Sequence, residues 1–311
     1  MTLRGLSIAS VITFSCLLPE PDGIEVQAQT VERSITVGGR TRTYRIFVPT
    51  NASSPVPLLL VFHGGGGTGR QMERFTRFTA VAAREHFVAI YPDGVDKNWN
   101  DGREGDFSTP HREHIDDIAF IDAILGRTAT EVPIDTHRIF ATGISNGGFF
   151  SNYLAALRPS TIAAFASVVA GLADPFHRSF HPGRPVSVMY LQGTEDPLVP
   201  YHSGNVARGK RGRLIDTEIA LGLWRTSNSC RSDPAISQLP DTDPGDGCTV
   251  TVHTWTGGQG GSDVVLYRIE GGGHTWPGGS QYLPRWLIGR VCGDVDATEV
   301  IWKFFTEHPK Q

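Results

Sequence analysis

The strongest chemical signal in this sequence is the turn Gly143-Ile144-Ser145-Asn146-Gly147, which has the pattern G-x-S-x-G. An apolar run at 138–142 precedes the turn, and an apolar helical pattern at 148–157 follows it. Between a strand and a helix, this pattern forms a sharp turn that presents the serine hydroxyl above the edge of a sheet. The start of the helix also favours negative charge at that point. We therefore predict that Ser145 is a nucleophile; the alternative is a glycine-rich turn without a chemical role.

A nucleophilic serine needs hydrogen-bond donors for the oxyanion that forms when it attacks a carbonyl group. The loop His63-Gly64-Gly65-Gly66-Gly67 directly follows the apolar run 57–62. In hydrolases whose nucleophile lies in a G-x-S-x-G turn, a loop in this place supplies a backbone N–H group. We predict an oxyanion hole at Gly64 and at the N–H of Asn146, with His63 as a structural residue rather than a base. A phosphate-binding loop is disfavoured, because no G-K-[ST] follows the glycines.

The remaining catalytic groups are expected later in the chain, in the order serine, acid, histidine. Asp196 lies in a Gly/Pro turn directly after the apolar run 186–191. We prefer Asp196 to its neighbour Glu195 and to Asp174, which follows another apolar run. An acid in this place can orient an imidazole ring.

The predicted base is His274, in the segment Gly271-Gly272-Gly273-His274-Thr275-Trp276-Pro277-Gly278-Gly279 after the apolar run 264–269. The carboxyl ends of parallel strands meet at one edge of an open sheet. We therefore expect Ser145, Asp196 and His274 to lie together as a catalytic triad.

The elements that would position these residues alternate between strands and helices. Strands are expected at 43–48 (near a sheet edge), 57–62, 87–91, 138–142, 165–170, 186–191 and 264–269, and helices at 71–85, 118–128 (capped by Asp116 or Asp117), 148–157, 216–227 and 297–307. Such alternation predicts an α/β fold, with a mostly parallel, doubly wound sheet and helices on both faces. We predict one catalytic domain over 29–311.

Composition restricts the class of protein. The chain has 311 residues, of which 39% are hydrophobic and 19% charged, and a formal net charge of -4. These values are typical of a globular protein and exclude coiled-coil, collagen-like and multi-span membrane classes. The one dense block of basic residues is 208–213. We therefore expect no nucleic-acid partner and no anionic membrane surface.

The N-terminus has the layout of a secretory signal peptide. Arg4 precedes an apolar run at 8–18, and 26–28 offers small-residue cleavage chemistry. We predict a signal peptide at 1–28, a secreted or periplasmic mature protein, and no stable membrane insertion once that segment is removed. Two alternatives stay open: a disordered extension, or a lipoprotein anchored through Cys16.

Removal of the signal would leave three cysteines. Cys230 and Cys248 flank a polar segment, 232–247, without clear periodicity. A disulfide across that segment would contribute about 3 kcal/mol on the chain-entropy model. Cys292 is then either a small buried hydrophobic residue or a third candidate for pairing, and the sequence leaves both open.

Other residues of chemical interest have weaker contexts. Trp99, Tyr201 and Trp276 are candidate substrate-binding aromatics, with Trp276 foremost and Trp286 as a further candidate. Trp224 and Trp302 lie in helical patterns and are expected in the core. His111 and His114 form an H-x-x-H pair in a polar loop, where we expect solvated surface rather than a metal site.

Seven segments together are similar to one known family: HGGGGTG, YPDG…NWN, DDIAFIDAIL, RIFATGISNGG, GTEDPLVPY, GGGHTWPGG and DATEVIWKFF. The chain resembles, over roughly 35–305, the secreted polyhydroxybutyrate depolymerase and feruloyl esterase family, a group of LpqC-like, carbohydrate-esterase-1-like α/β-hydrolases. The resemblance implies an α/β-hydrolase fold without a large lid domain, the triad and oxyanion hole named above, and a disulfide between Cys230 and Cys248.

Residues and resemblance together predict a secreted serine carboxylic-ester hydrolase that works through an acyl-enzyme, of feruloyl esterase or polyhydroxybutyrate depolymerase type. No cofactor or metal is expected. The expected substrate is a small or oligomeric ester, such as a phenolic or acetyl ester of a polysaccharide or a hydroxyalkanoate. Two alternatives remain: an acyltransferase using the same triad, and a non-catalytic secreted binding protein.

Overall fold

The fold is known from a computed structural model that describes residues 29–311 with the exception of 51 and 53. The predicted signal peptide and Cys16 lie outside the described residues. Within them, no helix combines the length and the apolar character needed to cross a membrane.

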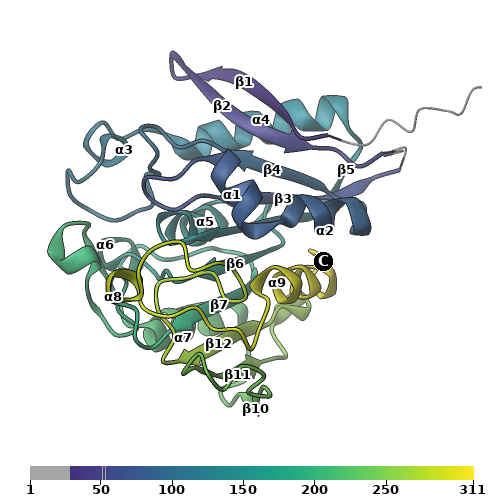
Figure 1. The fold of residues 1–311 in the computed structure, drawn as a ribbon. Helices are drawn as coiled ribbons and strands as arrows, with labels where there is room; N and C mark the ends of the chain where they lie inside the picture. Colours follow the sequence, from purple (N-terminus) through teal and green to yellow (C-terminus); the bar gives the residue numbers. More distant parts are fainter. Residues whose placement is uncertain (1–28, 51, 53) are drawn as a thin grey trace, which may run out of the picture.

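In the described part of the chain, ten strands form one sheet, in the order β1-β2-β4-β3-β5-β6-β7-β12-β11-β10 (Figure 1). The strands are β1 (Val31–Val37), β2 (Arg40–Phe47), β3 (Val56–Phe62), β4 (Val88–Pro92), β5 (Ile134–Ile144), β6 (Ala164–Val168), β7 (Ser187–Gly193), β10 (Ala235–Gln238), β11 (Thr249–Trp255) and β12 (Val264–Glu270). A separate two-stranded ribbon contains β8 (Gly204–Asn205) and β9 (Arg213–Leu214).

The middle of the sheet, from β4 to β12, is parallel, and antiparallel strands extend it on both sides. Every residue of β3, β4, β6 and β7 is buried. Strands that are covered on both faces are built mainly from apolar residues, which explains the predominantly apolar sequences of these four strands.

Helices cover both faces of the sheet. They are α1 (Gly69–Thr76), α2 (Phe78–Glu85), α3 (Thr109–Arg112), α4 (Asp117–Glu131), α5 (Asn146–Leu157), α6 (Asp174–His177), α7 (Thr217–Asn228), α8 (Arg285–Ile288) and α9 (Ala297–Glu307), with 3₁₀ turns η1 (Val206–Gly209) and η2 (Gln259–Gly261). Helices α4, α5 and α7 bury apolar residues in one core, and α1, α2 and α9 do so in the other. In Figure 1 the second group lies in front of the sheet. The predicted mostly parallel α/β fold with two covered faces is confirmed.

The strand expected near a sheet edge is β2, which lies next to the edge strand β1, as predicted. Other local features differ from expectation. The single helix expected at 71–85 is divided at Arg77, whose left-handed backbone (φ 58°) ends α1 and directs its N–H to the carbonyl of Glu73. The antiparallel strands β10 and β11 were not expected, although β11 alternates between buried and partly exposed positions as half-buried strands do.

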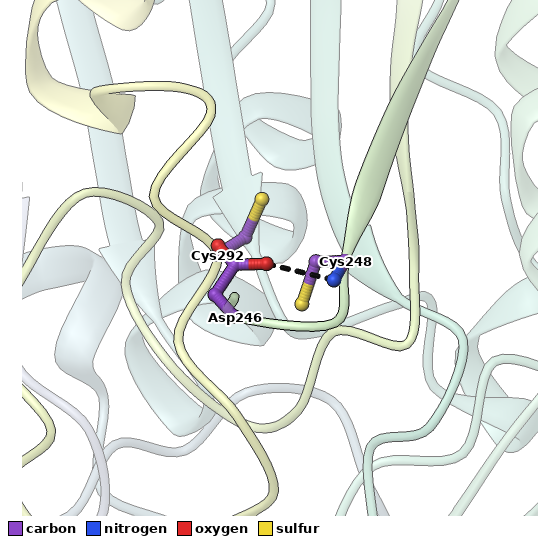
Figure 2. Close-up of side chains that lie close together, drawn as sticks. All are labelled: Asp246, Cys248 and Cys292. Carbon is purple, nitrogen blue, oxygen red and sulfur yellow. Dashed lines mark hydrogen bonds between the residues drawn. The ribbon is translucent and has the colours of Figure 1, made fainter. Parts of the chain in front are cut away.

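The expected disulfide between Cys230 and Cys248 is wrong. Both cysteines are free thiols, and they lie at opposite ends of β11. Next to Cys230, the Arg231 N–H bonds the Thr256 carbonyl just after β11, whereas Cys248 precedes the first residue of that strand. A seven-residue strand spans about 20 Å, but a disulfide requires Cα atoms within about 7 Å. The thiol near Cys248 belongs to Cys292 instead (Figure 2).

Candidate active site

The turn between β5 and α5 holds Ser145 in a strained backbone conformation, with φ 55° and ψ −122°. The flanking glycines permit close approach of neighbouring backbone. A Cβ atom at Gly147 would lie 2.3 Å from the Phe62 carbonyl oxygen, and one at Gly143 would lie 2.5 Å from the Gly147 carbonyl carbon. Only glycine tolerates such contacts. Because strain of this kind persists only where the surroundings enforce it, the close backbone contacts at the two glycines hold Ser145 in this conformation.

Asn146 is the first residue of α5, so its backbone N–H has no partner within the helix. Its buried side chain is held on both ends. The Oδ1 atom accepts the Trp99 N–H at 2.8 Å, and Nδ2 donates to the Trp99 carbonyl at 3.1 Å and to Asp101 Oδ2 at 2.6 Å. These bonds fix the start of the helix directly beside the serine.

The glycine loop after β3 lies against the serine turn. A Cβ atom at Gly64 would be 3.5 Å from the Ser145 Cβ, so the loop backbone approaches the hydroxyl closely. His63 anchors the loop: Nε2 accepts the Gly94 N–H at 3.0 Å, which leaves the proton on Nδ1, 2.8 Å from the Gly64 carbonyl. Burial lowers the pKa of His63 and keeps it neutral. This agrees with a structural role for His63.

The side chains of Asp196 and His274 contact each other. Asp196 Oδ2 accepts a hydrogen bond from His274 Nδ1 at 2.7 Å, and both side chains are buried. The other oxygen, Oδ1, accepts the N–H groups of Leu198 and Val199 at 2.7 and 2.8 Å, which orient the carboxylate. The alternative acids lie elsewhere: Glu195 is exposed and Asp174 pairs with Arg213 at 3.3 Å.

The loops that carry these two residues are held together by adjacent strands. The strands β7 and β12 pair in parallel, and the loops of Asp196 and His274 follow them. A Cβ at Gly193 would lie 2.3 Å from the Gly272 carbonyl oxygen, so these loops touch through glycine backbone. Bound to Asp196 in this way, Nδ1 carries the proton and His274 Nε2 is left to accept one.

A cavity of about 930 Å³ joins the predicted site residues. Ser145, Gly64, Asn146 and His274 all line it. Its other walls are formed by the glycine loop, by α1 and by the loops around 198–211 and 280–288, including the apolar residues Met72, Phe75, Leu198, Val199, Val206 and Leu283. A hydroxyl, a histidine and backbone donors on one mostly apolar cavity are the groups required for acyl transfer.

The predicted aromatic contacts need correction, because Trp99, Tyr201 and Trp276 are buried and do not line the cavity. The Trp99 indole donates to the His63 carbonyl at 3.0 Å and stacks on Phe150. The Tyr201 hydroxyl donates to Glu218 at 2.6 Å. The Trp276 indole donates to Thr298 at 3.1 Å. All three rings are therefore packed inside the protein. Trp224 and Trp302 are core residues, as expected.

The aromatic side chains that do line the cavity are Phe75 and Tyr282. Their rings contact each other edge to face at a centroid distance of 5.4 Å. Trp286 is 80% exposed, between the lining residues Leu283 and Ile288. Phe75 was hidden in a helical pattern and Tyr282 in a loop, so spacing alone offered no signal for either.

A buried polar network beside Asn146 was also missed. Asp101 accepts hydrogen bonds from the Arg103 guanidinium, from His111 Nε2 at 3.0 Å and from Asn146 Nδ2. Burial alone would raise the pKa of Asp101, but the charge of Arg103 and these bonds outweigh it and hold the pKa well below its usual range. His111 is 5% exposed, so its expected place on the solvated surface is wrong, while His114 is exposed as expected.

Known proteins that are similar to this chain include esterases. No protein-family model matches the chain. It is 29% identical over 264 residues, 81% of this chain and 76% of the relative, to a protein described as "Putative esterase NocK" from Nocardia uniformis subsp. tsuyamanensis. It is 27% identical to feruloyl esterase B of Piromyces equi over 70% of this chain, but spans only 39% of that relative. Identity with feruloyl esterase D of Neurospora crassa is 26%, over 79% of this chain and 77% of the relative.

Solved structures agree on the fold. An acetyl xylan esterase from Aspergillus awamori superposes with a TM-score of 0.56 at 16% identity, covering 79% of this chain and 94% of that one. A thermostable esterase superposes with a TM-score of 0.55 at 15% identity, covering 90% of this chain and 63% of that one. The chain therefore has the α/β-hydrolase fold, and its homologues in sequence include feruloyl esterases.

Proposed function

From an α/β-hydrolase fold and a sequence related to esterases, we propose that this protein is a serine carboxylic-ester hydrolase of feruloyl esterase type. The observation that carries the proposal is the buried hydrogen bond from His274 to Asp196, because His274 lines the same cavity as Ser145. In the proposed site, Ser145 is the nucleophile, His274 the base and Asp196 the group that orients it. Gly64 and Asn146 supply the oxyanion hole.

The reaction follows from these roles. Ser145 Oγ attacks the ester carbonyl carbon while His274 Nε2 takes the hydroxyl proton, and backbone N–H groups of the Gly64 loop and Asn146 stabilise the oxyanion. The C–O bond to the alcohol breaks, and His274 returns the proton to the leaving oxygen. Water then attacks the acyl-enzyme in the same way, releasing the acid and restoring Ser145. Asp196 stabilises the imidazolium in both halves.

The substrate class we propose is a phenolic or acetyl ester of a polysaccharide, with a hydroxyalkanoate oligomer as the further candidate. Relatives named feruloyl esterase and acetylxylan esterase/xylanase support the first class. The aromatic wall formed by Phe75 and Tyr282 supports a planar acyl group, because aromatic rings pack favourably on one another. We also propose that the protein is exported after removal of 1–28; N-terminal sequencing of exported protein should then begin at Gln29.

The proposed nucleophile can be identified by labelling with a fluorophosphonate, which reacts with activated serine hydroxyls. We expect one adduct per chain, located by peptide mapping at Ser145 and absent from Ser145→Ala. Ser280 is the matched control, because it lines the same cavity but does not lie on the strained turn. Labelling of Ser280, or continued labelling of Ser145→Ala, would contradict the proposed nucleophile.

A further inference from the structure

The walls of the active-site cavity carry positive charge. Three arginines line it, Arg74, Arg103 and Arg211, while none of the lining residues is an aspartate or glutamate. The whole chain, by contrast, has a formal net charge of -4. Because a cavity with low-dielectric walls focuses the electric field of its charges, the positive potential of the arginines is strongest inside the cavity, where substrate would bind.

The three arginines differ in how far their charge is neutralised. Arg103 forms a buried ion pair with Asp101 at 2.6 Å. Among the described residues, neither Arg74 nor Arg211 has an acidic group within ion-pair distance. The Arg211 guanidinium makes one long hydrogen bond, to the Asn98 side-chain oxygen at 3.3 Å. Arg211 is half-buried and lines the cavity, and its guanidinium keeps most of its N–H donors available.

Arg211 is also held in place over the oxyanion loop. A Cβ atom at Gly65 would lie 2.5 Å from Arg211 Nη1, so the guanidinium sits directly on the glycine backbone. Arg103 Nη1 donates to the Arg211 carbonyl at 2.8 Å and ties its backbone to the buried network. Arg211 is the residue of the basic block 208–213 that lines the cavity.

We propose that Arg211, aided by the charge of Arg74, binds a carboxylate of the substrate, so that this esterase prefers anionic esters. The inference rests on the proposed ester hydrolysis at Ser145 and adds the charge of its substrate. A guanidinium matches a carboxylate through two parallel N–H···O bonds, which are stronger than hydrogen bonds between neutral groups. The substrate class is an ester that keeps a free carboxylate near the scissile bond.

The test compares esters that differ only in charge. Monomethyl adipate carries the carboxylate on the acyl side, and 4-acetoxybutanoate carries it on the alcohol side; the neutral partners have a primary amide in place of the carboxylate, so that each compound keeps a single ester bond. We expect the wild-type protein to have a higher kcat/KM for at least one anionic ester than for its neutral partner. Arg211→Gln should lower this ratio of anionic to neutral kcat/KM about tenfold. Arg211→Lys should retain part of the preference, and Arg74→Gln should lower it less.

Arg213→Gln is the matched control, because Arg213 belongs to the same basic block but pairs with Asp174 and does not line the cavity. Its ratio should equal that of the wild type. Salt should reduce the wild-type ratio and leave that of Arg211→Gln nearly constant. Hydrolysis through Ser145 with no anionic preference, or an unchanged ratio in Arg211→Gln, overturns this inference alone. Loss of the proposed function would appear separately, as hydrolysis that survives Ser145→Ala.

A different observation carries a second inference, which concerns the thiols of Cys248 and Cys292. Their sulfur atoms and a carboxylate oxygen of Asp246 lie within 4.8 Å of one another, and all three residues are buried (Figure 2). Asp246 already accepts the N–H groups of Cys248 and Gly293, at 2.7 and 2.6 Å, so its carboxylate is occupied as a structural acceptor. The two thiols are therefore the groups of this cluster that can form a covalent bond with each other.

The position of this pair connects it with the catalytic histidine. Cys248 directly precedes β11, and Cys292 lies on the segment that runs beside the His274 loop. In that segment the Cys292 carbonyl accepts the Gly278 N–H at 2.8 Å, and the Arg290 carbonyl accepts the Gly273 N–H at 2.9 Å. A covalent bond between the cysteines would tie this segment to the sheet.

We infer that Cys248 and Cys292 form a disulfide under oxidising conditions. The oxidant we name is a low-molecular-weight disulfide. One cysteine thiolate attacks it and releases one thiol, the second cysteine thiolate attacks the mixed disulfide and releases the other, and the two protons pass to the released thiols. The two cysteines lose two electrons, and the small disulfide gains them.

The disulfide can be tested by refolding the whole chain with glutathione disulfide and mapping peptides without reduction. We expect a Cys248–Cys292 peptide pair, and a melting temperature about 5–10 °C above that of the reduced protein. Cys230→Ser should keep this shift, and Cys292→Ser should abolish it. Alkylation of both thiols after refolding, pairing with Cys230, or one bound zinc per chain with both thiols protected would each overturn the inference.

Discussion

Ser145→Ala should lower the turnover of any ester substrate by about 10⁴-fold or more, because the acyl-enzyme can no longer form. The remaining rate would come from the oxyanion donors and from binding, which do not require the hydroxyl. The measurement is kcat/KM on p-nitrophenyl acetate, p-nitrophenyl butyrate, methyl ferulate and hydroxybutyrate oligomers. The relative wild-type values across this panel also identify the acyl group that the cavity accepts.

The matched control is Ser280→Ala, which removes a hydroxyl from the same cavity without touching the turn after β5. We expect its kcat/KM to stay within a few-fold of wild type. Thermal unfolding of both variants separates a chemical effect from a folding defect. Because φ at Ser145 is strained and Ala tolerates it no better than Ser, the variant should not gain stability from relief of strain. Equal activity of wild type and Ser145→Ala would refute the proposed mechanism.

Asp101→Asn should destabilise the protein by about 3 kcal/mol, because it leaves the buried guanidinium of Arg103 without its counter-charge. The same substitution weakens the bond that holds the Asn146 side chain, so kcat should fall about tenfold through misplacement of the adjacent oxyanion donor. Urea unfolding at pH 7 gives the first quantity and steady-state kinetics the second.

The surface variant Asp135→Asn provides the comparison. Asp135 also pairs with an arginine, Arg138 at 2.6 Å, but this pair is partly exposed to solvent. Exposed ion pairs contribute about 0–1 kcal/mol, so this variant should lose little stability and no activity. A loss of stability in Asp101→Asn no greater than in Asp135→Asn would show that the buried network does not support the site.

The pH dependence of stability offers an independent check on Asp101. Its pKa is depressed in the folded protein. The carboxylate therefore contributes stability at pH values above its unfolded pKa, near 4, and the contribution is lost as pH falls below 4 toward the folded pKa. Between pH 4 and 7 this contribution is constant. Wild-type protein should thus lose more stability than Asp101→Asn on acidification below pH 4, as measured by urea titrations at several pH values.

Local patterns were sufficient for the architecture and for the predicted positions of the reactive groups. Apolar runs located the parallel strands β3, β4, β5, β6, β7 and β12, because strands covered on both faces consist mainly of apolar residues. Asp116 does cap α4, by accepting the Ala119 N–H at 2.8 Å. The predicted acid and base follow neighbouring parallel strands, so their contact across the Asp196–His274 bond was implied by topology.

Other expectations were wrong because the deciding neighbours are distant in the sequence. Trp99 and Trp276 have the same local signs as exposed aromatic residues near a site, yet their indoles bond residues 36 and 22 positions away. His111 belongs to a polar segment of the sequence, but its side chain is buried and hydrogen-bonds to Asp101. Cys248 was assigned to Cys230 by resemblance, whereas β11 separates the two and brings Cys248 close to Cys292.

The amino-acid sequence by itself determined the parallel strands and the main helices between them, the strand–turn–helix setting of Ser145 and the loops on which the predicted acid and histidine lie. These features depend on hydrophobic periodicity, glycine sterics and the common edge of parallel strands, all of which act over short segments. Only the tertiary structure decided which rings face the cavity, which arginines of the cavity are left without an acidic partner and which thiols lie close together. Those outcomes depend on burial and pairing between remote segments, which local residue patterns do not encode.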